Sequence, residues 1–382
     1  MRRIFFSIIS LELLVTAGCR DQYLPDIVAE APNYLVIEAV LNAGEGETNV
    51  HITRTTQIAR TSAITGEDNA LVTVEGKDNS SVSLSYAGNG VYFHPNLDLI
   101  IGNEYRLRVR TSNGKEYLSA FVVAKTTPPI DSITLGRRID KGMNVEVNSH
   151  DNTGNTRYYR WEYEETWEIH SHYYSRYIYE NKKVRKRVLP QEDVSVCWRH
   201  NNSTRIALGS TAKLAADVIS KIPILSFPFG DDRLSVRYSI LVRQYALEKE
   251  AYEYYDLLRK NTESLGTIFD AQPSENKGNI TCVNDPKEPV IGFVTASTIE
   301  KKRFFVLASE VPDWRFQEYC YSQLVTLRPD STEFYFGTGG YKPYDTIEID
   351  PVRSNPPAYL GAFDYCVDCT DRGGSTIRPS FW

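Results

Sequence analysis

The sequence predicts a mainly β protein: an N-terminal immunoglobulin-like β-sandwich followed by a larger, β-rich α+β domain with one prominent packed helix. Apolar and polar residues alternate with a period of two through much of the chain, and Gly, Asn and Asp separate the alternating runs. Tyrosine favours the same fold class, since the 382 residues include 25 Tyr but only 2 Met, and Tyr suits half-buried strands.

The first predicted domain covers residues 34–127. Alternating runs begin with "YLVIEAVLN" (34–42), and the Asn113-Gly114 pair between two later runs is the strongest short hairpin signal in the chain. Roughly seven strands in about ninety residues, without a helical period, are typical of an immunoglobulin-like sandwich. Consecutive prolines neither pair in a central strand nor continue a helix, so "PP" at 128–129 predicts the domain boundary.

The second predicted domain covers residues 128–382. Its aromatic-rich segment 157–190 places Tyr159, Trp161 and Tyr163 on one face of a strand, with charged residues on the other face. The run "RLSVRYSILVRQYAL" (233–247) predicts another long strand. Strand patterns return after residue 277, and the tail from residue 339 is rich in loop-forming residues.

Two helices are predicted in this second domain. Residues 247–266 carry apolar side chains at spacings of three and four, and Gly266 provides a C-cap. A shorter helix is expected over 210–222, where Ser210 or Thr211 offers an N-cap and Pro223 a stop.

The N-terminus predicts export. Residues 1–18 have a charged start, a short apolar stretch and small residues at the end, as in a lipoprotein signal peptide. Cys19 directly follows Ala17-Gly18, the arrangement of a bacterial lipobox, so we expect lipidation at Cys19 and a lipidated tether over residues 19–33. Thr16 and Glu12 depart from that pattern, and the alternative is a plain secretory signal with an incidental cysteine.

Composition limits the partners. The formal net charge is −6 and the one basic run is "KKVRKR" at 182–187, which is the pattern of a solvated hairpin tip, of a lipid-headgroup contact or of a contact with an acidic partner. Nucleic acid is not expected as a partner, because phosphate binding needs a concentrated Lys and Arg surface.

Five cysteines follow Cys19, an odd number in a compartment that favours disulfides. At most two bridges can form, which leaves one thiol free. The "CVDC" motif at 366–369 favours a structural disulfide, with metal binding, redox chemistry and a free thiol as the alternatives. The candidate disulfide residues are Cys197, Cys282, Cys320, Cys366 and Cys369.

No catalytic residue, metal site or cofactor is predicted. The pair His170 and His172, with Glu168 on the same strand face, resembles a metal pair but lacks an identifiable distant ligand. Neither a GxSxG elbow nor a phosphate-cradling glycine loop is present in the sequence.

Binding is the better prediction, because the 157–180 segment mixes Trp, Tyr and Arg as interface hot spots do. Alternation alone assigns about half of these aromatic residues to a sheet core. The terminal Phe381 and Trp382 are expected to dock on the protein surface, with recognition of a partner as the alternative. The candidate binding residues are Trp161, Tyr163, Trp167, Tyr173 and Tyr177.

Three segments together resemble a known family: "RYSILVRQYALEKEAYEYYDLLRKNTESLGTIFDAQPSENKGNITCVNDPKEPVIGFV" (237–294), the closing "CVDCTDRGGSTIRPSFW" (366–382), and "YLVIEAVLN" after the lipobox. They are similar to the Bacteroidota outer-membrane lipoproteins grouped as domain of unknown function 4249. The resemblance implies a lipid-anchored outer-membrane protein, exposed on the cell surface, whose partner is a TonB-dependent receptor β-barrel.

The function expected from this resemblance is that of a non-enzymatic accessory or binding subunit of a TonB-dependent transporter. A structural or adhesion lipoprotein of the cell envelope is the alternative, followed by a cell-surface hydrolase. The resemblance supplies no catalytic residues.

Overall fold

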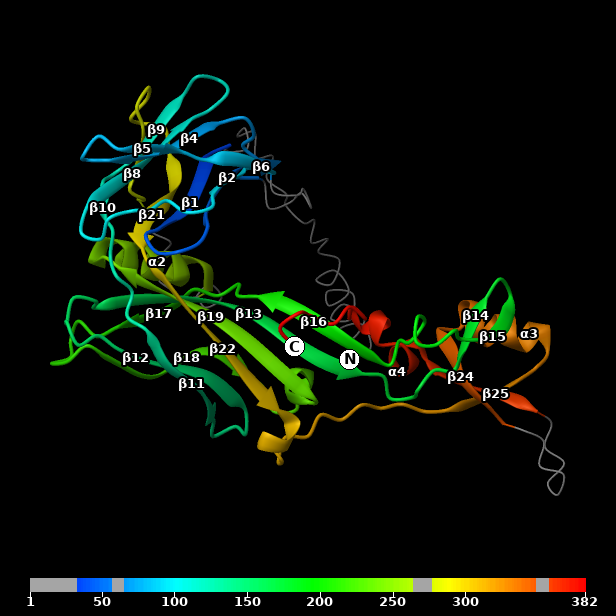
Figure 1. Ribbon diagram of the computed structural model, residues 1–382. Coiled ribbons are helices and arrows are strands. Elements are labelled where there is room, and N and C mark those ends of the chain that lie inside the picture. Colours follow the sequence, from blue (N-terminus) through cyan, green and yellow to red (C-terminus); the bar gives the residue numbers. More distant parts are fainter. Residues whose placement is uncertain (1–32, 57–64, 264–276, 348–356) are drawn as a thin grey trace, which may run out of the picture.

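The computed structural model describes residues 33–56, 65–263, 277–347 and 357–382. The chain forms three β-rich bodies: an N-terminal sandwich, a central body, and a distal body at the far end of the molecule from the sandwich (Figure 1). Helix α2 (Lys249–Glu263) lies between the sandwich and the central body. The predicted fold class, mainly β with one prominent helix, is confirmed.

The N-terminal sandwich consists of two sheets that bury alternate side chains. Its strands are β1 (Leu35–Asn42), β2 (Thr48–Arg54), β3 (Thr65–Gly66), β4 (Leu71–Gly76), β5 (Ser81–Ser83), β6 (Ser85–Gly88), β7 (Val91–His94), β8 (Glu104–Arg110), β9 (Glu116–Ser119), β10 (Val122–Val123), β20 (Ile280–Cys282) and β21 (Val290–Ser297). One sheet has the order β21-β1-β2-β7-β6, with β3 beside β2; the other has the order β20-β9-β8-β4-β5, with β10 beside β8. The alternation predicted in β8 is present, since Tyr105, Leu107 and Val109 are buried in the core.

The sandwich does not end at residue 127, where the sequence placed its boundary. Strand β21 pairs in parallel with β1 from Leu35 opposite Val290 to Asn42 opposite Ser297, and β20 pairs with β9. Without β21, β1 would be an open edge, and β21 also contributes buried Val294 to the core. Alternation identifies a strand but not its distant partner. The predicted ranges 34–127 and 128–382 therefore assigned β20 and β21 to the second domain, whereas both strands belong to the sandwich.

The central body is a second pair of sheets around its own core. Its strands are β11 (Ile130–Arg137), β12 (Met143–His150), β13 (Tyr158–His170), β16 (Val196–Asn202), β17 (Ala207–Ser210), β18 (Val218–Phe227), β19 (Arg237–Leu247) and β22 (Ile299–Leu307). The sheets have the orders β11-β12-β18 and β16-β13-β19-β22, with β17 beside β13. Val145 and Phe227 from the first sheet share a core with Trp161 and Tyr238 from the second. The 3-10 turns η1 (Asp232–Leu234) and η2 (Ala308–Glu310) adjoin this body.

The predicted helix over 210–222 is wrong. Its second half is the start of β18, which pairs with β12 and buries Ile219 and Ile224. Strand β18 is the edge of its sheet, so Pro223 is tolerated there instead of ending a helix. Long-range pairing of β-branched residues therefore overrides a weak local helix pattern.

The predicted helix over 247–266 is confirmed as α2, although it begins at Lys249 because Leu247 still belongs to β19. Its buried residues, Ala251 and Tyr254, pack against a cluster that includes Phe293 of β21. The predicted cap Gly266 lies outside the described residues. Within the described part of the chain, no helix combines the length and the apolar character needed to cross a membrane.

The distal body contains a three-stranded sheet of order β23-β25-β24 and a separate hairpin. Its elements are β14 (Tyr177–Glu180), β15 (Lys183–Lys186), β23 (Gln323–Thr326), β24 (Tyr341–Ile347), β25 (Ala358–Phe363), α3 (Pro329–Thr332) and the π-helical turn η3 (Glu333–Thr338). The turns α4 (Asp364–Val367) and η4 (Cys369–Arg372) lead back to the central body. The tail from residue 339 thus holds two strands that the sequence analysis missed.

Candidate functional site

Three of the five predicted binding residues belong to the core instead. Trp161, Tyr163 and Trp167 lie on the face of β13 that packs against the sheet β11-β12-β18, and at most 5% of each is exposed. The Trp161 indole donates a hydrogen bond to the buried Gln244 side chain at 2.7 Å. Alternation along β13 puts these rings inside, so they do not form a binding surface.

Tyr173 and Tyr177, the other two predicted binding residues, are half-buried in the distal body. The Tyr173 ring stacks on Tyr344 with centroids 4.3 Å apart, and its hydroxyl donates to the backbone carbonyl of Cys320 at 3.3 Å. The Tyr177 ring meets Tyr359 edge to face at 6.0 Å. Both rings pack against tyrosines of the distal sheet. They therefore contribute to the packing of the distal body and do not form an exposed binding surface.

Four of the five candidate cysteines form two disulfides, Cys197–Cys369 and Cys320–Cys366, and Cys282 is free and buried. The CVDC cysteines do not pair with each other. Cys369 bonds to β16 of the central sheet, and Cys366 bonds to the segment that enters the distal body. Because both sulfurs are consumed in these bonds, neither redox cycling of the motif nor metal binding by it fits this arrangement.

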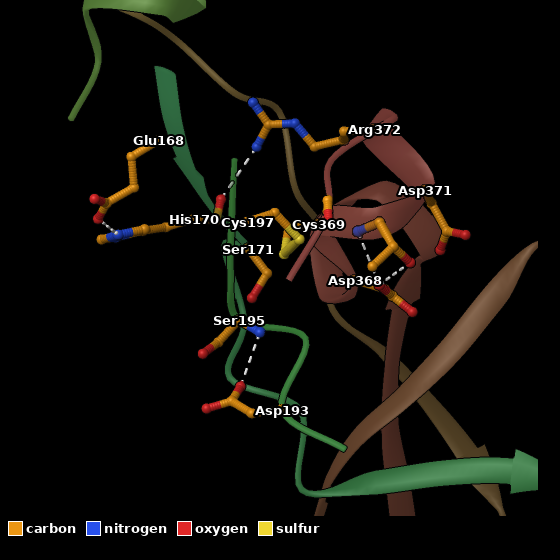
Figure 2. Close-up of a disulfide and its surroundings, with 12 residues drawn as sticks. Glu168, His170, Ser171, Asp193, Ser195, Cys197, Asp368, Cys369, Asp371 and Arg372 are labelled. Atoms are coloured by element: carbon orange, nitrogen blue, oxygen red, sulfur yellow. Dashed lines mark hydrogen bonds and ion pairs between the residues drawn. A yellow bond between two sulfur atoms is a disulfide. The ribbon is translucent and has the colours of Figure 1, made fainter. Parts of the chain in front are cut away.

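The bridge Cys197–Cys369 is the centre of the joint between the central and distal bodies (Figure 2). Beside it, the guanidinium of Arg372 donates to the backbone carbonyl of His170 at 3.1 Å and pairs with Glu318 at 3.0 Å. The joint is therefore fixed by a covalent bond and by charge-assisted contacts on several segments.

A second ion cluster lies on the distal side of this joint. Lys342 of β24 pairs with Asp368 at 2.6 Å and also contacts Asp371. Burial opposes the charge of Lys342, but the two carboxylates outweigh burial and raise its pKa. The same pairing lowers the pKa of Asp368 against the effect of its burial, so both groups stay charged and paired at neutral pH.

The predicted histidine pair does not act as a unit. His170 contacts Glu168 at 2.6 Å, whereas His172 lies beside Glu318 and Cys320, with ligand atoms within 4.8 Å of one another. The sulfur of Cys320 is committed to the disulfide, so the described part of the chain shows no complete ligand set at this point.

The C-terminal aromatic residues dock as predicted. The Trp382 indole donates to Glu168 at 2.8 Å and lies 4.9 Å from the Arg237 guanidinium, while Arg303 lies 3.6 Å above the Phe381 ring. These contacts cover the central sheet and fasten the chain end to it.

The distal body exposes a line of aromatic rings, which we call the aromatic strip. Consecutive ring centroids are 5.1, 5.6, 4.5 and 5.8 Å apart, and the last two rings are nearly parallel, at 7°. In order along the line, the strip consists of Phe334, Tyr335, Tyr341, Phe363 and Tyr365.

Different elements bring the strip together. Phe334 and Tyr335 come from η3, and Tyr341 and Phe363 are directly paired across β24 and β25. Phe334 is 64% exposed, while Phe363 and Tyr365 are nearly 40% exposed. Tyr335 and Tyr341, which lie between them, are half-buried. Several large aromatic rings exposed close together are uncommon on a protein surface and mark a candidate contact site.

The strip rests on a packed support. Phe336 of η3 is buried against Tyr179 of the hairpin and Tyr359 of β25, with centroids 6.1 and 6.2 Å away. The Tyr179 hydroxyl donates to Glu333 at 2.5 Å, which ties the hairpin to η3 and raises the pKa of Tyr179. One basic side chain of the β14–β15 hairpin is paired locally: Arg185 forms ion pairs with Glu180 of the hairpin and with Glu192, which follows it, both at 2.8 Å.

A cavity of about 650 Å³ between α2 and the N-terminal sandwich is the other candidate. Its lining includes Phe121, Glu248 and Tyr254, and burial raises the pKa of Glu248. Lys277 also lines this cavity. The aromatic strip is the better candidate, because it combines exposed large rings with a packed support.

Sequence reasoning missed the strip because its residues come from three short segments, 334–335, 341 and 363–365. The runs "EFYF", "YKPY" and "FDY" were visible signals of aromatic density, but only strand pairing and η3 place them in one row.

Comparison with known proteins gives one substantial match. A family model described as "Domain of unknown function (DUF4249)" matches residues 20–303. No curated protein matches the chain.

Solved structures give distant matches. The chain is 11% identical to the two fibronectin type-III domain segment of chicken tenascin, with a TM-score of 0.16, over 57% of this chain and 93% of that one. It is 15% identical to the FN1-FN3 domains of chicken CNTN1, with a TM-score of 0.20, over 56% of this chain and 63% of that one.

Proposed function

Because the chain belongs to the DUF4249 family, we propose that it is a surface lipoprotein that acts as a non-enzymatic accessory binding subunit of a TonB-dependent outer-membrane transporter. The observation that carries the proposal is the aromatic strip. Exposed Tyr and Phe rings present a large, rigid, amphipathic contact area at low entropic cost, which suits reversible capture and not covalent chemistry.

The disulfides support an extracytoplasmic location. Two structural bridges are typical of an exported protein, because disulfides persist in oxidising compartments, and the remaining thiol, Cys282, is buried. Cys197 and Cys369 are fully buried, which protects their bond from exchange with small thiols.

The proposed mechanism is capture beside a barrel. Lipid on Cys19, which lies outside the described residues, would confine the protein to the membrane plane next to its TonB-dependent receptor. Confinement raises the effective concentration of the binding surface at the receptor, so weak contacts with cargo suffice.

Co-purification tests this proposal. The native protein is isolated with an antibody from detergent-solubilised membranes, and its N-terminal peptide is analysed by mass spectrometry. We expect a diacylated Cys19 and a β-barrel partner in equal amounts, and we expect Cys19→Ser to release the protein from the membrane fraction. A surface-exposed lipoprotein without a barrel would favour an adhesion role, and substrate turnover abolished by one substitution would favour a hydrolase; either result contradicts the proposal.

A further inference from the structure

We propose that the aromatic strip binds the sugar rings of a neutral glycan. This inference deepens the proposed function by naming the chemical class of its cargo. It is argued from the geometry of the strip, from the charges around it and from the hydrogen-bonding groups that it leaves available.

The geometry suits sugar rings. A pyranose ring has an apolar face of C–H groups that stacks on an aromatic ring, and its edge carries hydroxyl groups. Phe363 and Tyr365 lie nearly parallel at 5.8 Å, and Tyr341 continues the row 4.5 Å beyond Phe363. Tyr335 is nearly perpendicular to Phe334 and Tyr341, at 89° and 88°, so the strip offers two stacking surfaces: Phe334 at one end and the row from Tyr341 to Tyr365 at the other. Separate stacking surfaces along one line fit different units of a sugar chain.

The charges around the strip favour a neutral ligand. Lys342, which follows Tyr341, is neutralised by Asp368 and Asp371. Glu333, which precedes Phe334, accepts the hydroxyl of Tyr179. The one Lys or Arg residue next to a strip residue in sequence is therefore paired, which gives an anionic polymer less counter-charge at the rings.

Polar groups remain available for hydroxyl groups. Within the described part of the chain, the hydroxyls of Tyr335 and Tyr341 make no hydrogen bond. Asp364 lies between Phe363 and Tyr365. Among the described residues, its carboxylate accepts only the backbone N–H of Tyr365, at 2.8 Å, and forms no ion pair. A carboxylate beside stacked rings is an acceptor for sugar hydroxyls and repels anionic chains.

A protein partner fits this surface less well. Protein hot spots lie in packed pockets surrounded by a rim that excludes water. The strip instead runs along the ends of two strands and a π-helical turn, and Phe334 is 64% exposed.

Affinity electrophoresis of the full-length protein in detergent tests the inference. Native gels contain dextran, glycogen, xylan or mannan as neutral polymers, and alginate as the anionic comparator. We expect at least one neutral polymer to retard the protein, and we expect Tyr341→Ala with Phe363→Ala to weaken that binding at least about tenfold, because two stacking surfaces are lost.

Two further variants keep the test valid. Phe334→Ala removes the most exposed ring of the strip, and it should weaken binding with the fold intact. Tyr86→Ala in the N-terminal sandwich, where Tyr86 is 44% exposed, is the matched control and should bind normally.

The inference fails if no neutral polymer retards the protein, if alginate retards it equally, or if the strip variants bind as well as the control. It also fails if the strip variants lose the co-purifying barrel, since the strip would then be a protein interface. An intact barrel complex without polysaccharide binding overturns this inference alone and leaves the proposed function standing.

Discussion

Removal of the bridge between the central and distal bodies gives the sharpest test of the structure. In the double variant Cys197→Ser with Cys369→Ser, both buried sulfurs are replaced by hydroxyl groups and no new free thiol is created. The bridge joins residues 172 positions apart, and the Cys320–Cys366 bridge, which spans 46 positions, is nested inside that loop.

The expected loss of stability follows from loop closure. The chain-entropy relation gives about 5 kcal/mol for a loop of 172 residues, and about 4 kcal/mol for the 46-residue loop. With the inner bridge intact, the effective outer loop is shorter by those 46 residues, which lowers the value only slightly because the dependence is logarithmic. Buried serine hydroxyls at both positions add to the loss.

Tryptophan fluorescence during urea unfolding without reductant is the assay. All five Trp residues of the chain report on the central body, since four lie in its strands or core and Trp382 docks on it. We expect a clearly lower midpoint for the outer-bridge variant. The matched variant Cys320→Ser with Cys366→Ser should loosen the distal body and change the Trp transition less.

Two results would refute this reasoning. One is an unchanged unfolding midpoint in the outer-bridge variant. The other is a non-reducing peptide map of the native protein in which Cys366 is linked to Cys369, because the structure connects each of them to a different segment.

Three other predictions follow from burial, backbone geometry and charge. Trp161→Ala should cost about 3–5 kcal/mol in urea unfolding, whereas Tyr365→Ala on the surface should cost less than about 1 kcal/mol. Gly292→Ala should lower the melting temperature, because φ is +129° and a Cβ there would lie 1.8 Å from a β1 carbonyl oxygen. Hydrogen bonds from Arg185 lower the pKa of Glu192 to about 2, so an NMR titration should show this ion pair complete above the ordinary value of 4.5 and lost as the pH falls through about 2.

The sequence predicted the strands and the helix that are determined by the spacing of apolar residues within one segment. Period two along β13 assigned Tyr159, Trp161 and Tyr163 to one face, and that face is buried. The same alternation should have removed Trp161 and Tyr163 from the candidate binding residues, since a face that alternates cleanly with charged residues is a core face. The α2 stripe was visible because its apolar spacing is helical and Ala251 and Tyr254 bury it.

The features that the sequence did not reveal depend on contacts between distant segments. Pairing of β21 with β1 joins residues some 255 positions apart, from Leu35 opposite Val290, and no local pattern specifies it. Five cysteines with one left free allow fifteen arrangements of two bridges, and their number favours none of them. The strip depends in turn on both kinds of contact, because β25 sets Phe363 beside Tyr341 and the disulfides fix the sheet that carries them.

The two cysteines of CVDC connect the disulfides to the aromatic strip. Cys366 closes the 46-residue loop that begins at Cys320, and every residue of the aromatic strip, from Phe334 to Tyr365, lies within that loop. Cys369, three residues on, fastens the loop to β16 of the central sheet. The first bridge reduces the freedom of the segment that carries the rings, and the second fixes its orientation relative to the rest of the molecule. A binding surface ordered before it meets its ligand loses less entropy on association, so the disulfides contribute to affinity without touching the ligand.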